Sequence, residues 1–234
     1  MREAARIFGI FWDPRPVFED LAVQPRWWTP ILLATVVSLA FTTALSRRIG
    51  WERVLEQEMR ANPRLELLTV EQQRAIIVRQ ARFVGIVSHA AAAVGPAASY
   101  LLVAAVLLGV FRNFGAAEIR FRQAFSVTSY SFLPMALGSA LAIVAMHLAD
   151  PEAFDVRNPL MLNAGWLVRA EGAPAWRRTL AASVDLFSIW ALLLLALGLS
   201  IAAGKLPYRR SLGLVAGTWL VYIGLKTGWS ALVG

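Results

Sequence analysis

Five long apolar stretches, separated by most of the charged residues, restrict what this chain can fold into. They cover residues 28–45, 84–111, 125–148, 180–203 and 212–233. Each is at least as long as the ~18 apolar residues with which an α-helix crosses ~30 Å of hydrocarbon at ~1.5 Å per residue. The predicted fold class is therefore an all-α integral membrane protein, a bundle of five transmembrane helices with short amphipathic interfacial helices.

The composition supports lipid as the solvent. The chain has 234 residues, of which 58% are hydrophobic and 16% charged, and its mean hydropathy is +0.57. A single soluble domain could not keep so much apolar surface out of water. There is no Cys, which excludes disulfides, thiolate metal ligands and a Cys nucleophile. We expect no cofactor.

The net charge of +8 indicates an anionic partner. Arg residues occupy short loops beside apolar segments instead of one continuous face, so anionic lipid headgroups are the predicted partner and nucleic acid is not. A membrane-protein partner or a second copy of the chain is a further partner that the sequence leaves open. The candidate lipid contacts lie in two short loops: Arg112, Arg120, Arg122, Lys205, Arg209 and Arg210.

The same loops predict an orientation. With five crossings, the N-terminus and the loops 112–124 and 204–211 share one face, and their excess of Lys and Arg predicts that this face is cytoplasmic. The C-terminus then lies on the opposite face of the cell's inner (cytoplasmic) membrane. The segment before residue 28 has mixed charge and several prolines, which argues against a cleavable signal peptide.

The sequence predicts two domains, an amphipathic cytoplasmic segment (1–27) and the transmembrane domain (28–234). The first alternates apolar and charged residues, and two interpretations stay open: it lies on the membrane surface, or it packs against the bundle. Asp13 before Pro14 is a candidate helix cap. Thr29 before Pro30 is a candidate N-cap for the first crossing.

Further patterns concern the helices and how they pack. The region 47–83 predicts two amphipathic helices broken at Asn62 and Pro63, and Thr69 with Gln72 forms a capping-box pattern before a helix that continues into the second crossing. Pro96 and Pro134 are expected to kink or open their helices. Small residues recur at spacings of four, for example Gly213 and Gly217 or Gly224 and Gly228. Such pairs favour packing within the bundle over a dimer interface.

Four titratable residues fall inside the apolar stretches: His89, His147, Asp185 and Lys226. The predicted topology places all four near the non-cytoplasmic face, where Asp185 and Lys226 are natural counter-ions. Such a pair is structural, or it belongs to a polar transport site; the first interpretation is favoured. No HExxH, GxSxG or facing carboxylate pair is present, and two His without Cys leave little to bind a metal. The sequence therefore predicts no enzyme.

Several segments together resemble the Yip1 domain family in its short bacterial form. They are the run from Asp13 to Phe18, then Pro25, Arg26, Trp27 and Pro30, the opening from Thr69 to Arg74, Asn158 with Pro159, and the run from Val184 to Trp190 with the Leu-rich stretch up to Gly198. The likeness covers nearly the whole chain.

The resemblance implies a five-helix integral membrane protein with a cytoplasmic N-terminus and no established catalysis. Eukaryotic relatives act in vesicle traffic and associate with Rab-type GTPases, partly through a longer N-terminal region than this chain has. The leading hypothesis is a non-enzymatic multi-pass protein that organises membrane or protein partners, in membrane trafficking or membrane organisation. The alternative is a small permease or lipid-handling protein with a polar intramembrane site at Asp185 and Lys226.

Overall fold

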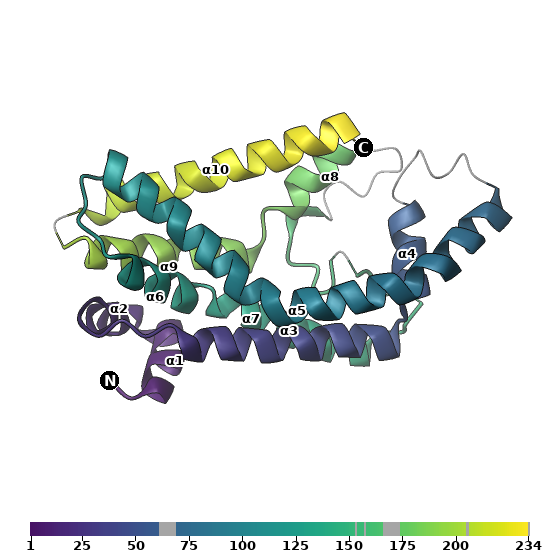
Figure 1. Cartoon of the computed structure of the whole chain (residues 1–234), viewed down its shortest axis with the longest axis horizontal. Helices are drawn as coiled ribbons and strands as arrows, with labels where there is room; N and C mark the ends of the chain where they lie inside the picture. Colours follow the sequence, from purple (N-terminus) through teal and green to yellow (C-terminus); the bar gives the residue numbers. More distant parts are fainter. Residues whose placement is uncertain (61–68, 153, 157, 166–173, 205, 234) are drawn as a thin grey trace. The chain divides into compact units, whose positions relative to one another are not determined.

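A computed structural model describes residues 1–60, 69–152, 154–156, 158–165, 174–204 and 206–233. In this part of the chain the regular secondary structure is helical, apart from one isolated antiparallel bridge between Asn163 and Asp185. Figure 1 shows the helices. Their bounds are α1 (Glu3–Trp12), α2 (Pro14–Val23), α3 (Trp28–Arg48), α4 (Trp51–Arg60), α5 (Val70–Phe114), α6 (Phe121–Ser131), α7 (Leu133–Leu148), α8 (Ala175–Ala182), α9 (Leu186–Ala202) and α10 (Tyr208–Val233).

The internal contacts divide the chain into two units. Unit 1 comprises Met1–Val36, Gly95–Leu137 and Leu186–Tyr222, and unit 2 comprises Val37–Val94, Gly138–Asp185 and Ile223–Gly234. Each unit collects segments that are distant in the sequence. Unit 1 holds the N-terminal segment with both short basic loops, whereas unit 2 holds the two longer loops.

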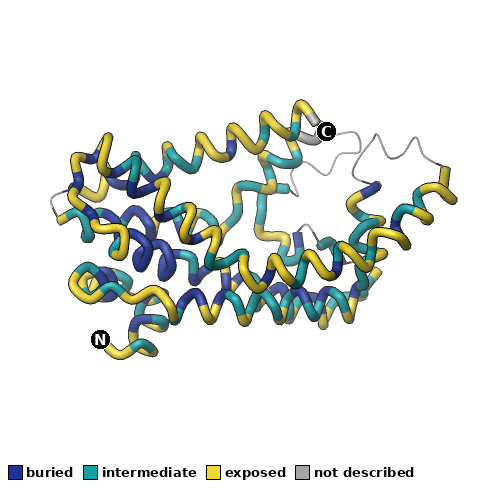
Figure 2. The backbone as a smooth tube through the Cα atoms, viewed as in Figure 1, coloured by how far each residue is buried: buried dark blue, intermediate teal, exposed yellow. Residues whose placement is uncertain are grey.

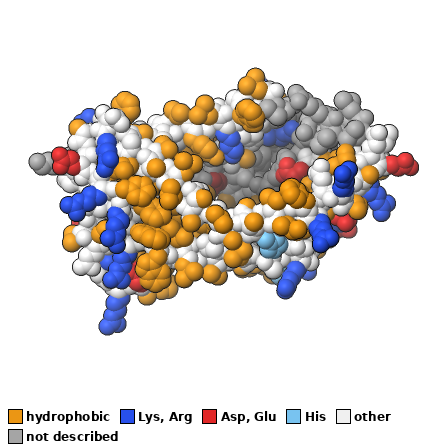
Figure 3. Space-filling view, viewed as in Figure 1, with side chains coloured by type: hydrophobic (Ala, Val, Ile, Leu, Met, Phe, Trp, Pro, Cys, Tyr) orange, Lys and Arg blue, Asp and Glu red, His pale blue; other side chains and the backbone are white. Residues whose placement is uncertain are grey.

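Three helical segments are long and apolar enough to cross a membrane: Trp28–Arg48, Val70–Phe114 and Phe121–Leu148. Only 28% of the most apolar window of each of the first two is buried inside the structure. The other apolar side chains face outward, as they do in a protein surrounded by lipid, and Figure 3 shows many of them on the surface. A membrane protein is thereby supported, and the count of five crossings stays a prediction.

The expected fourth crossing, residues 180–203, is not one helix. The chain leaves helix α8 at Ala182, and α9 begins at Leu186 and has 17 residues. Ser183 Oγ bonds the Thr179 carbonyl at 2.7 Å, and Asp185 pairs with Asn163. The Ser183 hydroxyl competes for a backbone carbonyl, and the backbone bridge at Asp185 belongs to an extended rather than a helical segment, so the apolar stretch is interrupted here.

Helix α6 is the most buried element of unit 1. All residues from Ala124 to Ser131 are buried, and Figure 2 shows this run in dark blue. Two of its hydroxyls bond within the helix: Thr128 Oγ1 donates to the Ala124 carbonyl at 2.8 Å and Ser129 Oγ donates to the Phe125 carbonyl at 2.7 Å. Polar side chains lie inside this unit because lipid offers them no partner.

Two of the predicted helix signals are confirmed. The Thr69 N–H donates to Gln72 Oε1 at 3.0 Å and the Gln72 N–H donates to Thr69 Oγ1 at 3.3 Å, which is the reciprocal capping box. Helix α5 then continues without interruption into the second apolar stretch. The predicted break at Asn62 and Pro63 lies outside the described residues.

The two intramembrane prolines differ in effect. Pro134 follows a break at Phe132, which separates α6 from α7, as expected for a proline that cannot donate to the preceding turn. Pro96 lies inside α5, and the helix continues through it. The predicted opening at Pro134 is confirmed, whereas α5 remains helical through Pro96 and a kink there stays a prediction.

The two predicted N-terminal caps have different outcomes: Asp13 occupies the N-cap position before Pro14, as predicted, whereas the Thr29 cap is wrong. Asp13 makes no side-chain cap bond; its backbone N–H instead bonds the Gly9 carbonyl at 2.8 Å and closes α1. Helix α3 already begins at Trp28, and Thr29 Oγ1 donates to Glu3 Oε2 at 2.9 Å. Thr29 loses the cap role because Glu3 of the first helix offers its hydroxyl another partner.

Helices α1 and α2 pack within unit 1. Val17, Phe18 and Leu21 of α2 are fully buried, as is Ile10 of α1, and α2 contacts both α6 and α9. Gly198 of α9 allows this approach, because a Cβ there would lie 2.8 Å from the Phe18 ring. Of the two interpretations of the N-terminal segment, the structure favours packing; whether residues 1–27 act as a separate cytoplasmic domain stays a prediction.

Candidate functional site

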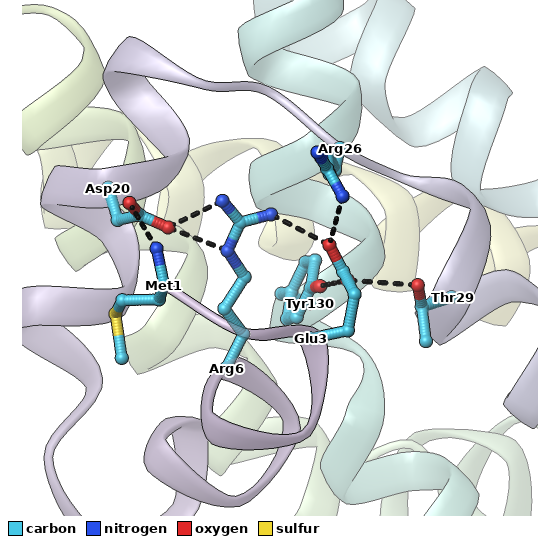
Figure 4. Close-up of polar contacts among 7 residues, drawn as sticks. All are labelled: Met1, Glu3, Arg6, Asp20, Arg26, Thr29 and Tyr130. Carbon is cyan, nitrogen blue, oxygen red and sulfur yellow. Dashed lines mark hydrogen bonds and ion pairs between the residues drawn. The ribbon is translucent and has the colours of Figure 1, made fainter.

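A buried arginine in the first helix organises the N-terminal part of unit 1. Arg6 is fully buried and lies between two carboxylates (Figure 4). Its Nε and Nη2 both contact Asp20 Oδ2 at 2.6 Å, and its Nη1 donates to Glu3 Oε1 at 3.1 Å. The Met1 ammonium bonds the other Asp20 oxygen at 3.0 Å. A buried guanidinium requires such paired partners, so α1 and α2 are joined by charge as well as by apolar contact.

Glu3 extends this network to the helices behind it. Its Oε2 accepts hydrogen bonds from the Tyr130 hydroxyl at 2.8 Å and from Thr29 Oγ1 at 2.9 Å. Its Oε1 also accepts from Arg26 Nη1 at 3.2 Å. One carboxylate therefore joins α1 to the start of α3 and to the buried helix α6. We call these seven residues the N-terminal lock: Met1, Glu3, Arg6, Asp20, Arg26, Thr29 and Tyr130.

The lock holds both carboxylates in their ionised form. Burial raises the pKa of Glu3, but the hydrogen bonds from Tyr130 and Thr29 and the charge of Arg6 outweigh it, and the net pKa is lowered. The pKa of Asp20 is lowered in the same way, because the bonds from the Met1 ammonium and Arg6 exceed the effect of burial. The network is thus an electrostatic tether at neutral pH.

The outer faces of α1 and α2 carry exposed aromatic and basic side chains. Trp12 is 86% exposed and Phe8 68% exposed. Arg2 and Arg15 are also exposed, Arg15 in an ion pair with Glu19 at 3.0 Å, and Figure 3 shows basic next to hydrophobic side chains in this region. Aromatic rings with nearby cations are typical of segments that lie at the headgroup level of a membrane. The lock therefore fixes a surface that suits a membrane interface.

The predicted lipid-contacting arginines also belong to unit 1, and all are exposed: Arg112, Arg120, Arg122, Arg209 and Arg210. Lys205 lies outside the described residues. Two of them also donate hydrogen bonds to backbone carbonyls. Arg112 Nη2 donates to the Ile119 carbonyl at 3.1 Å, and Arg210 Nη2 donates to the Phe114 carbonyl at 3.0 Å. Arg120, Arg122 and Arg209 form no ion pair with the described residues. Their charges are available to a ligand.

The four predicted intramembrane residues all fall in unit 2. Each histidine bonds a carbonyl of its own helix: His89 Nδ1 bonds Gly85 at 2.8 Å, and His147 Nδ1 bonds Ile143 at 2.8 Å. His89 also makes an edge contact with the Trp51 ring, with 6.1 Å between the ring centroids. The histidines thus have separate local surroundings.

Lys226 and Asp185 have different partners: Lys226 bonds Ser183, and Asp185 forms the backbone bridge with Asn163. Lys226 Nζ is 3.3 Å from Ser183 Oγ, two positions before Asp185, and Thr179 Oγ1 bonds Ser230 Oγ at 2.9 Å on the same pair of helices. No ion pair joins Lys226 to Asp185 in the described structure. Their role as structural pair or polar site stays a prediction. Within the described residues, no group of His, Asp and Glu could hold a metal.

The N-terminal lock was not predicted from the sequence. One signal could have indicated it: Arg6 lies four positions before Ile10, so a charged and an apolar residue share one face of α1. A charge on an apolar face needs a partner, and Glu3 at a spacing of three is the nearest candidate. The partners Tyr130 and Thr29 could not be inferred, because nothing local connects them to the first helix.

Comparison with known proteins identifies a family whose match covers both units. A family model of the Yip1 domain matches residues 8–229. The chain belongs to the Yip1 domain family. This Yip1 match spans nearly all the helices of both units, including α2, the buried α6 and the short basic loops. Searches of curated proteins and of solved structures returned no match.

Proposed function

We propose that this Yip1-family protein is a non-enzymatic multi-pass membrane protein that organises anionic lipids and membrane-protein partners, or further copies of itself, at the cytoplasmic face of the cell's inner membrane. Membership of the family supports a membrane-associated, non-enzymatic role. Its partners do not include nucleic acid. Trafficking or membrane organisation is the process that it serves.

One observation carries the proposal: the lock fixes α1 and α2 to the bundle and leaves their aromatic and basic outer face exposed. Arg6 and Glu3 make the buried contacts, while Trp12 and Phe8 are left outside. A segment that served only to fill the core would not expose its largest aromatic rings. Because this surface is already folded, it can bind headgroups without the loss of conformational entropy that a segment folding on the membrane would incur.

The exposed arginines of the short loops add electrostatic attraction. Arg120, Arg122 and Arg209 are in the same unit as α1 and α2, and each Lys or Arg near an anionic membrane surface contributes about 1 kcal/mol. A surface with several such charges therefore favours phosphatidylglycerol-type lipids over zwitterionic ones. The enrichment is expected to decrease at high salt.

The test is the lipid composition that accompanies the full chain out of its native membrane. Polymer-bounded nanodiscs are purified with the wild type and with an R120Q/R122Q/R209Q variant, and their lipids and proteins are identified by mass spectrometry. The matched control is R74Q/R79Q/R82Q, which removes three exposed arginines of α5 in unit 2. We expect the first variant to lose anionic-lipid enrichment several-fold and the control to keep it. Equal lipid compositions in all three samples would contradict the proposal.

A further inference from the structure

Unit 2 contains a groove that is largely open to its surroundings. It has a volume of about 620 Å³ and is formed by one face of α3 and the end of α7. This volume is in the range of small-molecule sites, roughly 300–1,000 Å³. The lining residues are Leu39, Ala40, Thr43, Ala44, Arg47, Arg48 and His147, and we call this feature the α3 groove.

The α3 groove changes from apolar to cationic along its length. Its α3 residues form two rows at spacings of four, one from Leu39 through Thr43 to Arg47 and one from Ala40 through Ala44 to Arg48. Residues four apart lie on one helix face, and eight positions extend about 12 Å. Small side chains in the middle of both rows leave the space, and both rows end in an arginine at the last turn of α3.

The two arginines of the groove differ in their bonding partners. Arg48 is bound to the end of α7, where its Nε lies 3.4 Å from the Met146 carbonyl and its Nη2 lies 3.3 Å from the His147 carbonyl. A cation at a helix C-terminus is favourable there. Arg47 is exposed and makes no hydrogen bond or ion pair with the described residues. Its guanidinium is available to a ligand at the mouth of the groove.

His147 supplies the third polar group. Its Nδ1 lies 2.8 Å from the Ile143 carbonyl, which only accepts, so Nδ1 carries the proton. In the neutral ring Nε2 is then an acceptor for a hydroxyl, and in the cationic ring it is a second donor for a phosphate oxygen. No Asp or Glu lines the groove, so its polar end favours an anion.

We propose that the α3 groove binds one anionic glycerophospholipid. The phosphate contacts Arg47 and Arg48, a headgroup hydroxyl or phosphate oxygen contacts His147, and the start of an acyl chain lies along Leu39, Ala40 and Ala44. A soluble anion would leave the apolar half empty. A zwitterionic lipid would bring its ammonium group beside two arginines.

The location of the groove supports a lipid as the occupant. Helix α3 is one of the three segments of membrane-spanning length and hydropathy, and Arg47 and Arg48 lie at its end, where headgroups lie beside a spanning helix. The site belongs to unit 2 and uses none of the unit 1 residues of the proposed function. Either proposal can therefore fail without the other.

The experiment counts lipids bound to the purified full chain by native mass spectrometry. Delipidated protein in detergent is titrated with phosphatidylglycerol or phosphatidylcholine, and glycerol 3-phosphate is added as a soluble competitor. R47Q removes the free cation, and A44L fills the middle of the groove. The matched controls on α5 are R79Q and A90L, which change an exposed Arg and an exposed Ala outside the groove.

We expect the wild type to retain one phosphatidylglycerol, about ten-fold more strongly than phosphatidylcholine. Loss of one cation should weaken this by about five-fold in R47Q, A44L should abolish it, and both controls should bind like the wild type. Equal retention of the two lipids would overturn the proposal, as would unchanged binding in R47Q and A44L. Displacement of the lipid by equimolar glycerol 3-phosphate would show a simple anion site and would also overturn it.

Discussion

The Tyr130 hydroxyl donates a 2.8 Å hydrogen bond to Glu3 Oε2 across 127 positions of sequence. Tyr130 is a fully buried residue of helix α6. The bond therefore fixes the first turn of helix α1 to the buried part of unit 1. The neighbouring Arg6 then ties the same carboxylate to Asp20 and α2. The N-terminal surface is positioned by this chain of contacts.

Removing the Tyr130 hydroxyl should loosen that connection. Tyr130→Phe keeps the ring and deletes one bond to a charged acceptor, so we expect the free energy of unfolding in detergent to fall by about 1.5–3 kcal/mol. Thermal unfolding followed by circular dichroism measures the change. Tyr208→Phe, at an exposed position in the same unit, is the control and should change little. Equal effects of the two substitutions would contradict the role given to Tyr130.

Arg6 should be the most sensitive position of the lock. Arg6→Ala leaves Glu3 and Asp20 without their shared cation, and breaking a buried ion pair costs about 3–5 kcal/mol. Arg15→Ala is the comparison, because the Arg15 to Glu19 pair is exposed and such pairs contribute about 0.2–1 kcal/mol. Limited proteolysis within residues 1–27 should accelerate strongly for the first variant only. Similar cleavage rates for both variants would count against the lock.

The lock should weaken in acid. The pKa values of Glu3 and Asp20 are lowered in the folded protein, so their stabilisation is complete above the ordinary carboxyl values and is lost as the pH falls through the folded values. The stability difference between the wild type and Glu3→Gln should therefore shrink below about pH 4.5, the ordinary value of Glu3. Hydrogen exchange of the α1 amides across a pH series measures it. A difference independent of pH would exclude an ionised Glu3.

Two glycines should respond oppositely to alanine. A Cβ at Gly198 would lie 2.5 Å from Val127 Cγ1, whereas a Cβ at Gly217 meets nothing within 4 Å. Gly198→Ala should cost about 1–3 kcal/mol through overpacking, and Gly217→Ala should be neutral or stabilise by up to ~1 kcal/mol, the helix propensity difference. Thermal melts of both variants decide this. Stabilisation by Gly198→Ala would show that α2, α6 and α9 do not pack as described.

Sequence periodicity and local chemistry predicted the features that depend on neighbours in the chain. The length of the apolar stretches predicted the long helices α3 and α5, and Thr69 with Gln72 predicted the reciprocal cap because both partners lie within one turn. The break at Pro134 follows from the geometry of proline itself. Local rules suffice where the interacting groups are three or four positions apart.

The sequence was less informative where distant partners decide the outcome. Thr29 has the residue type and position of an N-cap, yet it bonds Glu3, which the local pattern could not reveal. The apolar residues on either side of Asp185 suggested one helix, but the tertiary bridge to Asn163 interrupts it. The glycines of α10 suggested packing within the bundle, yet open space surrounds Gly213, Gly217, Gly224 and Gly228. Helix contacts in a bundle depend on the whole fold.

The most direct test of the account is the membrane depth of Trp12. The chain contains no Cys, so a single Trp12→Cys substitution carries one nitroxide label, and its accessibility to oxygen and to a water-soluble nickel complex is measured by electron paramagnetic resonance in phosphatidylglycerol-containing vesicles. Phe8→Cys is labelled as a second reporter on the same helix. We predict that both labels lie at the headgroup level, with a nickel accessibility below that of a label in water and an oxygen accessibility below that of a label in the hydrocarbon core. Full nickel accessibility at both positions, equal to that of a label in water, would contradict the account.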